Sequence, residues 1–162
     1  MLTRRLLALS QLASFAATAR DALADFKGSP LDDFRRAEEF FRDDRFDPAI
    51  YWYYRATYRM TAHLAARPET PAKDGADVVW KFDRESGDLL RKIAHGDLRK
   101  LVRVMDRVLA ESRTQDDAYT PRAQFPQAHA KAYAELREMR DATWKNRWRI
   151  RNERERDGLV NK

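Results

Sequence analysis

The residue types that catalysis and metal binding need are scarce in this chain. The histidines are His63, His95 and His129, and none of them stands three residues after an acid, so the Glu-x-x-His pair of di-iron bundles does not occur. There is no His-Glu-x-x-His motif, and a chain without cysteine forms neither a thiolate zinc site nor an iron–sulfur cluster. We therefore expect no metal site and no cofactor.

Adjacent carboxylates are the next place to look for acid–base chemistry. They occur as Asp32-Asp33, Glu38-Glu39, Asp43-Asp44 and Asp116-Asp117. Neighbouring residues of a helix point about 100° apart, so adjacency does not bring two carboxylates together. Several of these acids fall in an expected first helical turn, where negative charge favours the helix dipole. No serine lies in a Gly-x-Ser-x-Gly elbow. No residue is therefore predicted to be catalytic, and we expect a protein that is not an enzyme.

Aromatic and arginine side chains are concentrated in the segment 50–60, IYWYYRATYRM. On a helix, one face of this segment would enter the core, and Trp52, Arg55 and Arg59 would share another face. One interpretation is a central helix that is buried on all sides. The other is an interface, because aromatic and arginine residues are enriched where proteins meet each other, a membrane surface or stacked bases. The interface interpretation predicts contacts by Tyr51, Trp52, Tyr53, Arg55 and Arg59.

A second segment of this composition lies near the C-terminus, at 144–151, WKNRWRIR. A solvated, charged helix end would account for the arginines. Tryptophans interleaved with arginines are costly to leave in water, however, which favours an interface with protein, lipid headgroups or RNA. This interpretation predicts contacts by Trp144, Arg147, Trp148, Arg149 and Arg151.

The elements that must position these residues are helices. Apolar residues recur at helical spacing along nearly the whole chain, and 162 residues suit a single domain, 1–162. We expect an all-α fold of five or six helices, with proline-bearing connectors at 68–77 and 113–126. Gly96 is placed to kink or divide the helical stretch between them, and a short strand is conceivable only near Val78. A long helix over 127–157 should project its basic tip, because its apolar stripe ends at Trp148.

The first twenty residues, 1–20, contain Arg4, Arg5 and Arg20 and no acid. This composition is typical of a mitochondrial presequence, retained here as an amphipathic helix; a secretory signal and a basic cytosolic helix are the alternatives. The longest uncharged stretch, 6–19, is shorter than the roughly 20 residues that span a bilayer. We expect a mitochondrial protein, peripheral to the inner membrane. Arg4 and Arg5 could then contact an anionic lipid such as cardiolipin, unless the neighbouring leucines simply complete the core.

Charge is unevenly distributed along the chain. The 32 Lys and Arg residues exceed the 26 Asp and Glu residues, which gives a net charge of +6. Residues 21–47 contain nine acids and five bases, whereas 131–156 contain nine bases and five acids. The basic C-terminal part motivates RNA binding as an alternative function, and the many acids weigh against it.

The start Leu2-Thr3-Arg4, followed by Leu6, Leu7 and Phe15, faintly resembles the Leu-Tyr-Arg motif proteins, with Thr3 in place of the tyrosine. Those are small helical mitochondrial subunits and assembly adaptors. In general character the chain is also similar to accessory subunits of mitochondrial inner-membrane complexes. The resemblance implies a non-catalytic structural subunit of a respiratory complex or the ATP synthase. Its partners would be other subunits of a large hetero-oligomeric complex, and not DNA. The alternative is an RNA-binding mitochondrial ribosomal protein.

Overall fold

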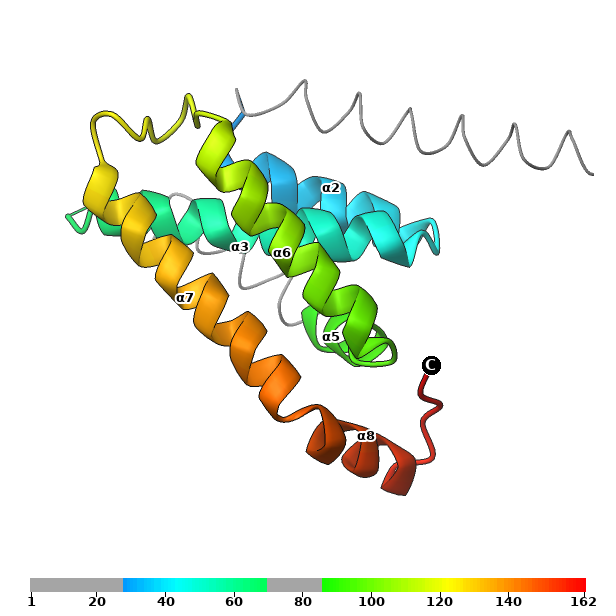
Figure 1. Ribbon diagram of the computed structural model, residues 1–162. Coiled ribbons are helices and arrows are strands. Elements are labelled where there is room, and N and C mark those ends of the chain that lie inside the picture. The colour runs from blue at the N-terminus through cyan, green and yellow to red at the C-terminus, as the bar shows by residue number, and fades with distance from the viewer. Residues whose placement is uncertain (1–27, 70–85) are drawn as a thin grey trace, which may run out of the picture.

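The computed structural model describes residues 28–69 and 86–162, and within these ranges the fold is all-α, as the sequence predicts (Figure 1). The helices of the described residues are α2 (Pro30–Arg42), α3 (Phe46–Ala66), α5 (Asp88–Ala94), α6 (Leu98–Thr114), α7 (Pro126–Lys145) and α8 (Arg147–Arg156). None of them is long and apolar enough to cross a membrane. The presequence-like segment with Arg4 and Arg5, most of the connector 68–77 and the stretch near Val78 lie outside the described residues.

Helices α2 and α3 form an antiparallel pair that is determined by local signals at both ends. The Asp32 carboxylate accepts a hydrogen bond from the Ser29 backbone N–H at 2.8 Å, and Pro30 occupies the first turn, so local capping signals determine where α2 begins. The turn between the helices places Asp44 at φ 56, a left-handed conformation that aspartate tolerates better than most residues. This pair presents one side of α3 to α2 and leaves the other sides for the remaining helices.

Helix α3 is the centre of the domain. It contacts α2, α5, α6 and α7, and its alanines Ala49, Ala56 and Ala62 are fully buried, which allows the neighbouring backbones to approach closely. A helix that is buried on several sides loses the usual division into an apolar and a polar face. The aromatic and arginine residues of α3 must therefore find partners inside the protein.

Gly96 and Asp97 divide the helical stretch after residue 88 into α5 and α6. The backbone N–H of Gly96 bonds to the Ile93 carbonyl at 2.9 Å, and the Asp97 carboxylate caps α6 by accepting from the Lys100 N–H at 3.0 Å. Division at Gly96 is thus one of the two outcomes that the sequence left open. One side of α6 is an apolar stripe that is buried at every position: Leu98, Leu101, Val102, Met105, Val108 and Leu109.

The prediction of a single long helix over 127–157 is wrong, because the helix is interrupted at Asn146. The Ala142 carbonyl accepts from both the Asn146 side chain at 2.8 Å and the Asn146 backbone N–H at 2.9 Å, and α8 leaves in a new direction (Figure 1). Its tip does not project freely: Arg154 donates to the Lys92 carbonyl at 2.5 Å. Met139 of α7 is exposed. Helix α8 therefore returns to α5.

Candidate functional site

The aromatic and arginine residues predicted as contacts on α3 lie mostly in the core. Tyr51, Trp52, Arg55 and Arg59 are at most 6% exposed, and Tyr53 is half-buried. The structure corrects the interface interpretation at these positions and matches the alternative of a helix buried on all sides. The physical reason is that carboxylates from other parts of the chain compensate the two arginines inside the protein.

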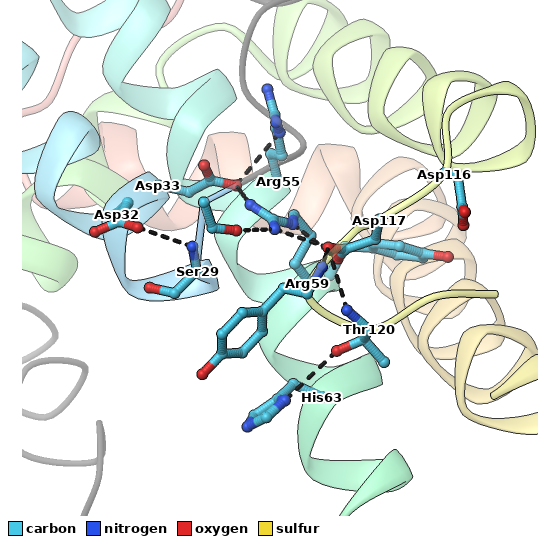
Figure 2. Close-up of polar contacts among 12 residues, drawn as sticks. Ser29, Asp32, Asp33, Arg55, Arg59, His63, Asp116, Asp117 and Thr120 are labelled. Carbon is cyan, nitrogen blue, oxygen red and sulfur yellow. Dashed lines mark hydrogen bonds and ion pairs between the residues drawn. The ribbon is translucent and has the colours of Figure 1, made fainter. Parts of the chain in front are cut away.

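Arg59 is the hub of this compensation (Figure 2). Its Nε and Nη2 atoms donate to the two Asp117 carboxylate oxygens at 2.9 and 2.8 Å, which is the bidentate geometry that favours arginine over lysine. Its Nη1 atom donates to Asp33 at 2.9 Å, and Nη2 also donates to the Gly28 carbonyl. Arg55 Nε lies 3.3 Å from the same Asp33 oxygen. We call Asp33, Arg55, Arg59 and Asp117 the buried ion cluster; it ties α3 to α2 and to the connector before α7.

In the buried ion cluster, burial and the neighbouring charges have opposite effects on the pKa values of Asp33 and Arg59. Burial raises the pKa of the Asp33 carboxyl, and the positive charges of Arg55 and Arg59 oppose that rise. Burial by itself would lower the pKa of Arg59, but the hydrogen bonds and charges of Asp117 and Asp33 outweigh it and raise the pKa. Asp33 and Arg59 thus support each other's charged state, and the cluster acts as a structural clamp between α2, α3 and the connector before α7.

The connector after α6 is held by the same cluster and by His129. One Asp117 oxygen accepts from the Tyr119 N–H at 2.9 Å, which folds the chain back over its own side chain. His129 Nε2 lies 2.6 Å from the Thr120 carbonyl oxygen, so Nε2 must donate. In the neutral ring Nδ1 then accepts from the Tyr58 hydroxyl at 3.0 Å. These contacts position the start of α7 against α3.

Two other histidines make stability depend on pH. Burial, assisted by the charge of Arg67, lowers the pKa of His63 below its ordinary value of 6.5, and burial with Arg154 and Arg91 lowers that of His95. The unfolded chain therefore binds protons at these two histidines more readily than the folded chain does. We expect the two histidines to lower the free energy of unfolding as the pH falls below about 6.5, and urea midpoints at about pH 7.5 and 5.5 measure this loss.

The control for this prediction replaces both histidines with glutamine. The raised pKa of Asp33 works in the opposite direction, so the informative quantity is the difference between the wild-type and His63→Gln/His95→Gln proteins. The variant should lose less stability than the wild type on acidification. An equal loss in the two proteins would contradict the assignment.

The contact residues predicted near the C-terminus lie at the surface, unlike those predicted on α3. Trp144, Arg147, Trp148 and Arg151 line a cleft of about 430 Å³ together with the start of α6 and the chain end at 161–162. We call it the basic cleft. Arg149 points elsewhere and pairs with Glu153 at 3.2 Å. Four of the five predicted residues are thus brought together on one concave surface.

The tryptophans of the basic cleft are exposed but ordered by arginine. Trp144 is 38% and Trp148 61% exposed. The Arg147 guanidinium carbon lies 4.7 Å from the Trp144 ring centroid and 5.7 Å from that of Trp148, and its Nη1 donates to the Trp144 carbonyl at 2.9 Å. Arg151 approaches the Trp148 ring at 5.6 Å. The conformation of the Arg147 side chain is therefore already restricted in the chain without a partner.

Two further arginines of the basic cleft were missed by sequence reasoning. Arg99 and Arg103 lie one helical turn apart on the exposed side of α6 and line the same cleft. Their i, i+4 spacing was visible in the sequence, but nothing there connected α6 with α8. Within 28–69 and 86–162, neither they nor Arg147 and Arg151 form an ion pair with a carboxylate. The cleft accordingly offers guanidinium groups to an anionic ligand.

No family model, characterised protein or solved structure was found to match this chain. Among the described residues, no group of three or more His, Asp or Glu side chains could hold a metal ion. The site that the geometry defines is therefore the basic cleft, a concave surface with exposed tryptophans and arginines that suits binding of an anionic partner.

Proposed function

We propose that this chain is a non-catalytic accessory subunit of a membrane-associated mitochondrial complex, such as a respiratory complex or the ATP synthase, and that the basic cleft joins it to its neighbours. The observation that carries the proposal is the exposure of Trp148 and Trp144 in a concave surface with arginines. Tryptophan and arginine in such surroundings dominate the binding energy of many protein interfaces. The location in mitochondria is supported by the acid-free, arginine-bearing segment 1–20.

Native electrophoresis after mild detergent extraction tests this function. We expect the tagged full chain to migrate with a large complex in mitochondria of its source organism. Trp148→Ala should shift the chain to a free, low-mass form, because the most exposed ring of the cleft is lost. Met139→Ala removes an exposed apolar side chain outside the cleft and should leave the migration unchanged. A wild-type chain that migrates alone would contradict the proposal.

An RNA-binding mitochondrial ribosomal protein is the second candidate. The observation that favours it is the set of cleft arginines without carboxylate partners beside two exposed rings, since guanidinium and indole groups bind phosphates and stack on bases. Under this function the chain would bind RNA with a steep salt dependence, and replacing Arg147, Arg149 and Arg151 with alanine would abolish the binding.

A further inference from the structure

We propose that the basic cleft binds an acidic segment of a partner protein, in which carboxylates stand next to an apolar side chain. This inference rests on the proposed function, because it names the chemistry of the partner that the cleft would receive. It follows from the charge of the cleft, the preorganisation of one arginine, the exposed indole rings and the short extent of the surface.

The positive charge of the cleft is neutralised by almost no acidic side chain among its own lining residues. Arg99, Arg103, Arg147 and Arg151 line it, and Asp97 is the one acidic side chain among the lining residues. The Asp97 carboxylate is already engaged as the cap of α6, accepting from the Lys100 N–H at 3.0 Å. An incoming carboxylate would therefore meet guanidinium groups without first displacing an acid of this chain, and charge-assisted hydrogen bonds would form on both sides of the cleft.

Arg147 is the best-prepared of these groups. Contacts with Trp144 and Trp148 and the hydrogen bond from its Nη1 to the Trp144 carbonyl restrict its side chain. The remaining N–H groups of the fork are available for a bidentate contact with a carboxylate. Because its rotamers are already limited, less entropy is lost when the partner binds.

The apolar part of the partner follows from the exposure of the rings. Trp148 leaves 61% of its surface exposed beside the arginines. An aliphatic or aromatic side chain placed next to the bound carboxylates would cover this surface and exclude water from the ion pairs. A purely polar polyanion would leave that area wet.

The extent of the cleft favours a short peptide over a nucleic acid strand. The cleft has a volume of about 430 Å³, and the backbone N–H of Lys162 donates to the Gly96 carbonyl at 2.8 Å between two of its lining segments. Arg147 and Arg151 lie over the Trp148 ring, so the ring face on which a base would stack is already in contact with guanidinium groups.

Fluorescence anisotropy with the full chain tests the inference. The probe is a labelled peptide, Glu-Leu-Glu-Glu-Leu-Glu, and the matched peptide has Gln in place of Glu. Binding of the acidic peptide should be saturable, weakened by salt and about tenfold or more tighter than binding of the Gln peptide. Arg99→Gln/Arg103→Gln, a pair of exposed side chains, and Arg147→Gln should each weaken it by about tenfold.

Arg137→Gln is the matched control, because this α7 arginine is exposed and lies outside the cleft. It should bind the acidic peptide like the wild type. Equal affinity for both peptides, or no loss in the cleft variants, would overturn the inference. Tighter binding of a labelled oligouridine than of the acidic peptide would overturn it in favour of RNA. If Trp148→Ala still releases the chain from its complex while the acidic peptide fails to bind, the proposed function stands and only the chemistry assigned to the partner falls.

Discussion

Replacing Arg59 with methionine should lower the free energy of unfolding by about 3–5 kcal/mol, the usual cost of removing one partner from a buried ion pair. Arg59 is fully buried, and Asp117 beside it is 1% exposed. Without the guanidinium, no cation among the described residues would pair with Asp117, and a buried carboxylate without a paired cation is costly. Chemical denaturation followed by circular dichroism measures the change.

The control for this prediction is an exposed arginine that also pairs with an aspartate. Arg35 bonds to Asp32 at 2.7 Å, but its side chain is 57% exposed. Arg35→Met should therefore change the free energy of unfolding by less than about 1 kcal/mol. Arg59→Lys separates charge from geometry, since lysine keeps the charge and loses the fork; it should lie between Arg59→Met and the wild type. A loss for Arg59→Met no larger than that for Arg35→Met would show that the buried ion cluster does not stabilise the fold.

Replacing Trp52 with alanine should cost about 3–5 kcal/mol, as for other large aromatic side chains removed from a core. Trp52 is 4% exposed, and the guanidinium carbons of Arg55 and Arg36 lie 4.5 and 4.7 Å from its ring centroid. Deleting the ring would leave a cavity between two helices and remove both cation–π contacts. The same denaturation experiment measures the loss.

Trp148→Ala is the control for this second prediction. Trp148 is 61% exposed, so its removal should change the free energy of unfolding by less than about 0.5 kcal/mol. The two tryptophans would then divide cleanly: Trp52 stabilises the fold, and Trp148 serves the basic cleft. A destabilisation by Trp148→Ala as large as that by Trp52→Ala would mean that the exposed ring is part of the folded core and would remove the reason to see a docking surface there.

The sequence by itself determined most of the helices of the described chain. The start of α2 follows from Ser29, Pro30 and Asp32, and the division between α5 and α6 follows from Gly96. These signals act within a few residues, because a cap satisfies N–H groups of its own first turn and an apolar stripe is set by helical periodicity. They need no knowledge of what lies elsewhere in the chain.

The break at Asn146 was not predicted, although it too is local. Nothing in the periodicity of 127–157 marks the position, and an asparagine within a polar helix is usually tolerated. Its side-chain bond to Ala142 acts together with the long-range bond from Arg154 to Lys92, which holds α8 against α5 in its new direction. A local weakness became a bend because a distant contact stabilised the bent form.

Whether an arginine or tryptophan became core or surface was decided only by the tertiary structure. Segments 50–60 and 144–151 are both rich in aromatic and arginine residues, yet the first is mostly buried and the second lines a cleft. Arg59 is buried because Asp33 and Asp117, 26 and 58 residues away, converge on it. In the part of the chain that the structure describes, no carboxylate pairs with Arg147, and Arg99 and Arg103 line the same cleft instead. A charge can leave water only where an opposite charge meets it, and such meetings depend on packing between distant elements, which composition does not encode.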